Sequence, residues 1–449
     1  MLHEVRLPQI TLARLTDVVV LQIWLLFYAA SKTSLGPGDK QDCANKLDKC
    51  PRFSGRGSKI ADWIWGANAA KLGPLKKLAQ DSTVTSSEKK KGIQRLSRDA
   101  FGLLKNANSP IEPFKGTEPW QIATSDFFIN LYEKVLRQSP KTFQTPPRLT
   151  QVVIGFPPFI FSDPHASQFG AQEFLRAFFE ENKSNLTICP ACDEAPYSIS
   201  AGRVYVNTGD RKIEADIDHY LPKSSYPHLA CHPYNLVPNC PFCNQRKKKD
   251  KDPLSRYVSG ISSRRTLNDI HQIYREKGLV KSTYLEVDFS NSFKAPRIIT
   301  LKPKSGCNVR EALFSLEEVY QIPAGWQEPS ETEAEILFNR LQAFLDSHDS
   351  PFDSLEVIDW LDAYLFSILE EWGRQAYAVL KVWLLVQHIN ETNSVFDSSG
   401  RKIRNTAFLQ ELELLCGIQN SAYSTHLLSK PTVRDRFQQA RDWRESLVT

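Results

Sequence analysis

Four cysteines in two close pairs are the residues whose spacing most clearly predicts chemistry. Cys189 and Cys192 form one Cys-x-x-Cys pair, and Cys240 and Cys243 form the second. Two such pairs can supply the four thiolates of the closed, tetrahedral site that is typical of structural zinc. Core thiols or redox chemistry are the alternatives, but the pairs flank an expected hairpin, which favours zinc. The sequence therefore predicts a structural Zn²⁺ site.

The segment between and just after these pairs holds side chains that suit a second, catalytic metal. Asp218 and His219 are neighbours at the end of an expected strand, Asn235 lies in a proline-bounded loop, and Asn244 follows Cys243 directly. Carboxylate and amide oxygens suit hard ions such as Mg²⁺, and a neutral imidazole beside a metal can act as a base. Hydrolysis of a phosphodiester needs such a base, together with positive charge for the transition state.

A basic cluster follows Asn244 directly. Its residues nearest the motif are Arg246, Lys247, Lys248, Lys249 and Lys251, and Arg256, Arg264 and Arg265 lie farther along. A solvated charge run is the ordinary interpretation, but the position beside a candidate metal ligand favours phosphate contacts. Such contacts would give a salt-sensitive, largely sequence-independent affinity. The lysines are expected on the solvent face of a helix.

Three further polar residues near the motif are expected to face solvent. Asp216 shares a strand face with Asp218 and could assist the metal, although exposure is favoured. His228 and His232 lie in the loop of the motif, where they could touch a substrate, but a surface position is favoured for both.

The segments DHYLPKS, YNLVP and CPFCNQRKKK together resemble the HNH nuclease family, the zinc-bracketed branch of the ββα-metal nucleases. The resemblance implies that His219 is the general base and that Asp218 and Asn244 bind a catalytic Mg²⁺ or Mn²⁺. It also implies that Asn235 restrains the loop carrying His219. It covers residues 189–252 only. It implies an endonuclease that cuts nucleic acid, with double-stranded DNA as the expected substrate, in a setting such as bacterial phage defence or restriction.

Strands and helices around the motif are expected to position these side chains. Residues 203–218 alternate on both sides of the turn sequence Asn-Thr-Gly-Asp at 207–210, which predicts a β-hairpin. Its second arm, residues 212–221, would deliver Asp218 and His219. Residues 172–181 predict an amphipathic helix that leads into Cys189.

The length of 449 residues predicts several domains. Prolines between residues 139 and 148 indicate a linker. We expect a mainly α multidomain protein with a central small ββα-metal (HNH) module that is stabilised by zinc. Residues 1–150 would be helical, 151–258 would hold the module (core 189–252), and 259–449 would be helical. Gly66 and Gly73–Pro74 are expected to divide residues 60–78 into short helices.

Composition limits the class of protein. The residues are 41% hydrophobic and 24% charged, a composition typical of globular proteins. The net charge of +5 permits a polyanionic partner. Nine cysteines without a disulfide framework favour a reducing cytoplasm. Residues 18–30 are apolar but shorter than the roughly 20 residues of a membrane span, which favours a buried helix and no membrane association.

Two other functions remain open from the sequence. A zinc module without catalysis would only bind nucleic acid. Alternatively, the chain is an effector subunit that acts only when a partner, such as an ATPase or sensor, engages the helical domains. Those domains could also support a homo-oligomer.

Overall fold

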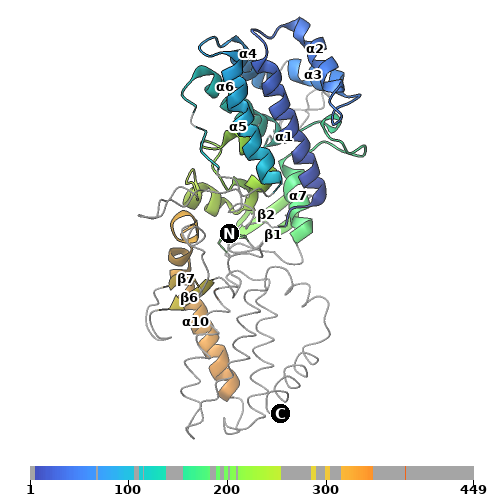
Figure 1. Ribbon diagram of the computed structural model, residues 1–449. Helices are drawn as coiled ribbons and strands as arrows, with labels where there is room; N and C mark the ends of the chain where they lie inside the picture. The colour runs from blue at the N-terminus through green and yellow to red at the C-terminus, as the bar shows by residue number, and fades with distance from the viewer. Residues whose placement is uncertain are drawn as a thin grey trace, which may run out of the picture.

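Helices build the N-terminal part of the chain in this computed structural model (Figure 1). They are α1 (Gln9–Ala30), α2 (Pro37–Asp48), α3 (Gly57–Trp65), α4 (Ala69–Gln80), α5 (Ser86–Leu104), α6 (Pro119–Leu131) and the π-helical η1 (Tyr132–Leu136). The structure describes residues 6–66, 69–105, 111–114, 116–137, 155–182, 189–192, 197–200, 203–208, 211–253, 285–289, 299–303, 315–346 and 380. Within these ranges the expected mainly helical character is confirmed.

Helix α1 lies at the centre of this helical part. Most of its residues are buried, including Leu15 and Leu25, and α4 and α5 pack along it. The buried Asp17 forms an ion pair with Arg52, so protein covers even a charged position of the helix. Among the described residues, α1 is the one helix long and apolar enough to cross a membrane, by length and composition only. The expectation of a buried helix over residues 18–30 is confirmed.

Helices α5 and α6 pack closely because a glycine faces a tryptophan between them. Helix α5 begins at a capping box, in which the Glu88 carboxylate accepts from the Thr85 backbone N–H (2.8 Å). A Cβ at Gly92 would meet the Trp120 ring at 2.2 Å, so only glycine permits this approach. Helix α4 packs against both α1 and α6, so these helices form one helical part, and η1 continues from α6.

Two small antiparallel sheets follow α7 (Ala171–Asn182). The first contains β1 (Tyr197–Ser200), β2 (Arg203–Thr208) and β3 (Arg211–Glu214), in the order β1-β2-β3. The second contains β4 (Asp216–His219) and β5 (Leu236–Asn239), with Asp218 opposite Val237. The pairing of β2 with β3 confirms the predicted hairpin. Its second arm is not one strand, because Ala215 separates β3 from β4 and the chain changes sheet there.

Short helices and a C-terminal segment complete the described structure. They are η2 (Pro158–Ile160), η3 (Pro227–Leu229), η4 (Pro233–Asn235), the π-helical η5 (Phe242–Lys248), β6 (Leu285–Phe289), β7 (Ile299–Pro303), η6 (Ser315–Val319) and α10 (Ile322–Asp346). Helix η5 contacts β4, so the two paired strands β4 and β5 and this short π-helix lie together. Helix α10 and the β6–β7 pair lie at the opposite end of the described structure from α1–α6 (Figure 1).

One hydrophobic core connects these elements. It runs from α1 through α6 to β4 and β5, and it includes Tyr320 and Trp326 from the C-terminal segment. The predicted segments 1–150 and 151–258 therefore share a core, and the exact domain division stays a prediction. Helix α7 confirms the helix expected before Cys189. Gly73 and Pro74 lie inside α4 rather than ending it, which corrects that expectation. The predicted linker at 139–148 lies outside the described residues.

Candidate functional site: a four-cysteine cluster beside a buried Asp-His pair

The four cysteines come together as a buried cluster that could hold a zinc ion. The Sγ atoms of Cys189, Cys192, Cys240 and Cys243 all lie within 4.8 Å of one another, and those of Cys192 and Cys240 are 3.8 Å apart. A tetrahedral ion with Zn–S bonds of about 2.3 Å separates its sulfurs by about 3.8 Å. A disulfide would need about 2.05 Å. The geometry therefore fits four ligands of one ion.

The proton balance of this cluster also favours a cation. Burial raises the pKa of Cys189, but hydrogen bonds from the other thiols outweigh it and bring the pKa well below its ordinary value. The hydrogen bond with Cys189 raises the pKa of Cys192 and of Cys243 well above theirs. A divalent cation would stabilise all four thiolates together, because its charge offsets the repulsion between neighbouring negative sulfurs.

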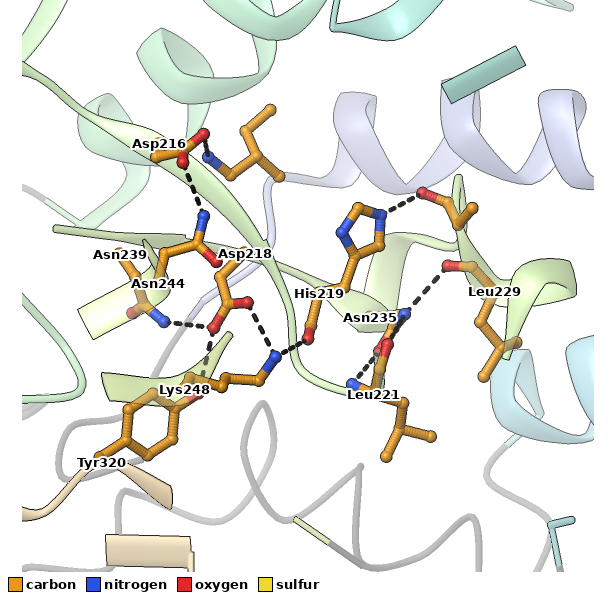
Figure 2. A network of polar contacts seen from close by, with 12 residues as sticks. Asp216, Asp218, His219, Leu221, Leu229, Asn235, Asn239, Asn244, Lys248 and Tyr320 are labelled. Carbon is orange, nitrogen blue, oxygen red and sulfur yellow. Dashed lines mark hydrogen bonds and ion pairs between the residues drawn. The ribbon is translucent and has the colours of Figure 1, made fainter. Parts of the chain in front are cut away.

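Asn235 fastens the long loop between β4 and β5. Its Oδ1 accepts from the backbone N–H of Leu221 (2.7 Å), and its Nδ2 donates to the carbonyls of Leu221 (3.0 Å) and Leu229 (3.1 Å). The side chain is fully buried. Three hydrogen bonds from one amide join the start of the loop to its middle, as the sequence predicts for this residue (Figure 2).

The imidazole of His219 is held by this same loop. Its Nε2 lies 3.0 Å from the carbonyl oxygen of Ala230, close to the segment that Asn235 fastens. A carbonyl only accepts hydrogen bonds, so the neutral ring carries its hydrogen on Nε2 and keeps a lone pair on Nδ1. The His219 residue as a whole is buried, with 6% of its surface exposed. Burial lowers the pKa of His219 to about 3, which keeps the ring neutral.

The N-terminal helical layer forms one wall around His219. The Tyr132 ring packs edge-on against the imidazole, with 4.2 Å between ring centroids, and its hydroxyl lies 3.4 Å from the Ile217 carbonyl oxygen. Lys223 of the loop forms an ion pair with Glu133 (2.8 Å). Residues 132–133 are thus part of the site's surroundings, although they lie far upstream of the motif.

Asp218 is buried and bonded to three donors. Its Oδ1 pairs with Lys248 Nζ (3.0 Å), and its Oδ2 accepts from Asn239 Nδ2 (2.8 Å) and the Tyr320 hydroxyl (3.2 Å). Burial raises the pKa of this carboxyl, and the neighbouring Lys248 opposes the rise. Asp218 and His219 point to opposite faces of β4, as strand geometry requires (Figure 2). The carboxylate of Asp218, which the sequence predicts as a metal ligand, thus forms an ion pair with the ammonium of Lys248.

Asn244 lies on the same face of β4 as Asp218. Its Nδ2 donates to Asp216 Oδ2 (2.6 Å), and Asp216 shares a strand face with Asp218. Within the described residues no bond joins Asp218 to Asn244. Because Nδ2 is committed to Asp216, the amide oxygen of Asn244 points elsewhere and is available as a hard ligand. The binding of one divalent ion by Asp218 and Asn244 stays a prediction.

Asp216 is only partly exposed, which corrects its assignment to solvent. Its carboxylate also accepts from Gln245 Nε2 (3.1 Å) and lies 3.9 Å from Arg137. This residue connects the first turn of η5 to β4 and orients Asn244.

The basic cluster divides into two groups. Lys247 and Lys248 are buried, and Lys248 pairs with Asp218, so neither matches the predicted solvent-facing phosphate contact. A charge run in the sequence does not reveal a buried carboxylate opposite it. Arg246, Lys249 and Lys251 are exposed, although Lys251 donates to the Glu318 carbonyl (2.9 Å). Arg256, Arg264 and Arg265 lie outside the part of the chain that the structure describes.

His228 and His232 are fully buried, so their predicted surface positions are wrong. The loop packs against α5, where His232 Nε2 donates to the Ala100 carbonyl (3.0 Å). His228 Nε2 lies 3.7 Å from Asp99, and neither of its ring nitrogens makes a hydrogen bond within the described residues. The sequence showed local polarity there but not the helix that covers the loop.

Buried His228 is expected to make the fold acid-sensitive. Burial lowers its pKa to about 3, below the unfolded value near 6.5. The unfolded chain therefore binds this proton first, and the stability contribution is complete above pH 6.5 and lost as the pH falls toward 3. At pH 5 the loss is about 2 kcal/mol.

Denaturant unfolding of His228→Leu at pH 8 and pH 5 checks this. The variant should lose about 2 kcal/mol less than wild type on acidification, whereas the exposed His165→Leu should follow wild type. Equal losses in wild type and His228→Leu would show that His228 does not carry the effect.

Three residues that surround the site have no signal in the motif. Asn239 lies directly before Cys240, and the Cys240–Cys243 pair beside it indicates zinc binding by the cysteines but no role for the asparagine. Tyr132 and Tyr320 are 85 and 102 residues away from the β4 residues that they contact. Contacts over such separations depend on the fold rather than on local spacing.

Comparison with known proteins adds no relative. No family model, no curated protein and no solved structure matches this chain.

Proposed function

We propose that the chain is a metal-dependent endonuclease that hydrolyses phosphodiester bonds of nucleic acid. The observation that carries this proposal is the oriented imidazole of His219. Its Nε2 is fixed to a carbonyl, its Nδ1 can accept a proton, and the preceding residue of β4, Asp218, has a carboxylate that pairs with a cation on the opposite face of the strand. An oriented imidazole and a carboxylate are two of the groups that metal-assisted hydrolysis with a general base uses, and they support the proposal.

Each residue of the site has a separate role in the proposed reaction. His219 Nδ1 accepts the proton of the attacking water, while the Ala230 carbonyl keeps the ring in the required tautomer. Asn235 holds the loop that contains Ala230. Asp218 and Asn244 would hold the divalent ion, which when bound stabilises negative charge on the phosphoryl and leaving oxygens. The ion pair with Lys248 must open for Asp218 to take that role.

The exposed part of η5 supports a nucleic-acid substrate. Arg246 is exposed and lies over the ring of the exposed Phe242 (5.8 Å to the centroid), and Lys249 is also exposed. Guanidinium and ammonium groups bind phosphates without reading sequence, and an exposed aromatic ring can stack on a base. Double-stranded DNA is the preferred substrate in this proposal, with phage defence or restriction in a bacterium as the setting.

Cleavage of supercoiled plasmid by the purified full chain tests the proposal. Nicked or linear product should form with Mg²⁺ or Mn²⁺ and not with a chelator, and added salt should reduce the rate. Zinc content is measured in the same samples, so that loss of the scaffold ion is not mistaken for loss of the catalytic ion. Binding of DNA without cleavage under every metal condition would replace the proposal with a binding-only zinc module.

One observation favours a partner-gated form of the same enzyme. Asp218 is bonded by Tyr320, which lies just before α10 in the C-terminal segment. A partner that moves this segment would alter the cation-holding carboxylate directly. Activity that appears only with such a partner would support this second candidate.

A further inference from the structure

The outward face of α5 carries positive charge from its second turn to its end. The exposed basic residues that share this face, by the helical period of about 3.6 residues, are Lys91, Arg95, Arg98 and, at the C-cap, Lys105. With a rise of about 1.5 Å per residue, this α5 row spans about 21 Å. The two carboxylates of α5 lie elsewhere, since Glu88 closes the capping box in the first turn and Asp99 is buried. The α5 row therefore presents one sign of charge to solvent.

Little of this charge is neutralised by the protein itself. Arg95 lies 3.8 Å from Glu112, but the two side chains are 47% and 73% exposed, so this pair contributes little. Within the described residues, the side chains of Lys91 and Arg98 make no ion pair or hydrogen bond. The α5 row thus keeps its charge available to a partner from outside the chain.

Helix α2 gives the contrast, because lysines on its surface are paired with carboxylates. Lys40 lies 2.6 Å from Asp62, and Lys46 lies 3.0 Å from Asp42. Surfaces that only keep a protein soluble usually intersperse both signs in this way. The α5 row instead places like charges at helical spacing, where they repel each other and weaken the helix. A polyanionic partner would offset that repulsion.

The α5 row lies beside the loop that holds the candidate base. Helix α5 runs along α1 toward the loop between β4 and β5 (Figure 1). On the inner side of α5, the Ala100 carbonyl accepts from His232 of this loop (3.0 Å), and Asp99 lies 3.7 Å from His228. The same loop holds the ring of His219. A ligand on the outer face of α5 would therefore be held next to the segment that positions the base.

We propose that the α5 row binds the phosphate backbone of duplex DNA and holds the duplex beside the β4–β5 loop. The inference rests on the proposed nuclease function, and it extends the substrate surface from η5 to the N-terminal helices. A DNA duplex carries one negative charge per about 1.7 Å of its axis, so a cationic row of about 21 Å faces a continuous series of phosphates. Such contacts give affinity and orientation but no sequence preference.

Binding of a fluorescein-labelled DNA duplex by the full chain tests this surface. Anisotropy is measured without added Mg²⁺ or Mn²⁺, so that cleavage does not interfere. The test variant combines Lys91→Gln, Arg95→Gln and Arg98→Gln. Its dissociation constant should rise about 10-fold or more, and the slope of log affinity against log salt should decrease in magnitude by about 2 to 3. Zinc content and circular dichroism should match wild type, because all three side chains are exposed.

Lysines of α2 and its C-cap supply the matched control. Replacing Lys40, Lys46 and Lys49 with glutamine removes the same net charge from a different face. This variant should bind the duplex with nearly the wild-type affinity and salt slope. Equal losses in the two variants would assign the binding to net charge alone. That result, or an unchanged affinity in the α5 variant, would overturn the inference.

Plasmid cleavage by the same samples separates this inference from the nuclease proposal. Wild-type cleavage together with normal binding by the α5 variant would remove the α5 surface and keep the nuclease. Binding that depends on the α5 row without any cleavage would keep the surface and remove the nuclease, and a wild-type chain that does not bind DNA would overturn both. Arg98→Gln alone should reduce the salt slope by about 1, which gives the same test if the triple variant loses its fold.

Discussion

Replacing Cys243 with serine is expected to abolish zinc binding and to unfold the hairpin and helix that carry the candidate site. A serine hydroxyl stays protonated at neutral pH, so the closed set of four thiolates is lost. Structural zinc supplies about 10–16 kcal/mol in small zinc-binding peptides, which is comparable to the whole stability of a domain. The β4–β5 sheet has only two strands of four residues each, too few to be stable alone.

The loss should extend beyond the cysteine loop. Trp326 of α10 bonds the Cys192 carbonyl, and Tyr132 of the N-terminal layer packs on His219, so unfolding of the unit exposes apolar surface on both sides. Thermal unfolding followed by circular dichroism should show a lower midpoint, and limited proteolysis should cut between residues 189 and 253.

A second buried cysteine supplies the control for this change. Cys231 is fully buried in the same loop but lies outside the cluster. Cys231→Ala should keep one zinc per chain and lose only about 1 kcal/mol of stability, as for a small cavity. A full complement of zinc in Cys243→Ser would show that these cysteines are not the ligands of a structural ion.

Fixed local spacing explains which parts of the site could be predicted from the sequence. Two residues between cysteines leave little freedom, so Cys240 and Cys243 must point to one centre, and the structure places all four Sγ atoms together. Asn235 was predictable for a similar reason, because an amide between two prolines has mainly backbone groups to bond. The helix before Cys189 and the β2–β3 hairpin follow from apolar periodicity and turn residues.

Burial by distant segments explains what the sequence could not show. The run of lysines after Asn244 predicts an exposed face, yet Lys248 is buried because a carboxylate at position 218 lies opposite it. His228 is buried because α5 covers the loop, and nothing within the loop encodes that helix. Tyr320 contacts Asp218 across 102 residues. Each of these depends on tertiary contacts that no local pattern determines.

His219→Ala is expected to lower the cleavage rate about 10²- to 10⁴-fold, the usual contribution of a general base. Burial lowers the pKa of His219 to about 3, so the neutral base is present above that pH and is lost only as the pH falls through it. The wild-type rate should therefore lack the decline below pH 6.5 that an ordinary histidine would cause. A low pKa also weakens the base, and the anionic phosphodiester beside the ring opposes this by favouring the imidazolium.

A variant at a histidine outside the site helps to show whether the lower rate comes from lost catalysis or from a damaged fold. His165→Ala removes an exposed imidazole and should cleave at the wild-type rate. The cavity that His219→Ala leaves beside Tyr132 has the size of the lost ring, so added imidazole should restore part of the activity. Equal zinc content in both variants shows that the scaffold is intact. Undiminished cleavage by His219→Ala would remove His219 as the base, and the bond from Nε2 to the Ala230 carbonyl would then be a structural contact of a buried histidine.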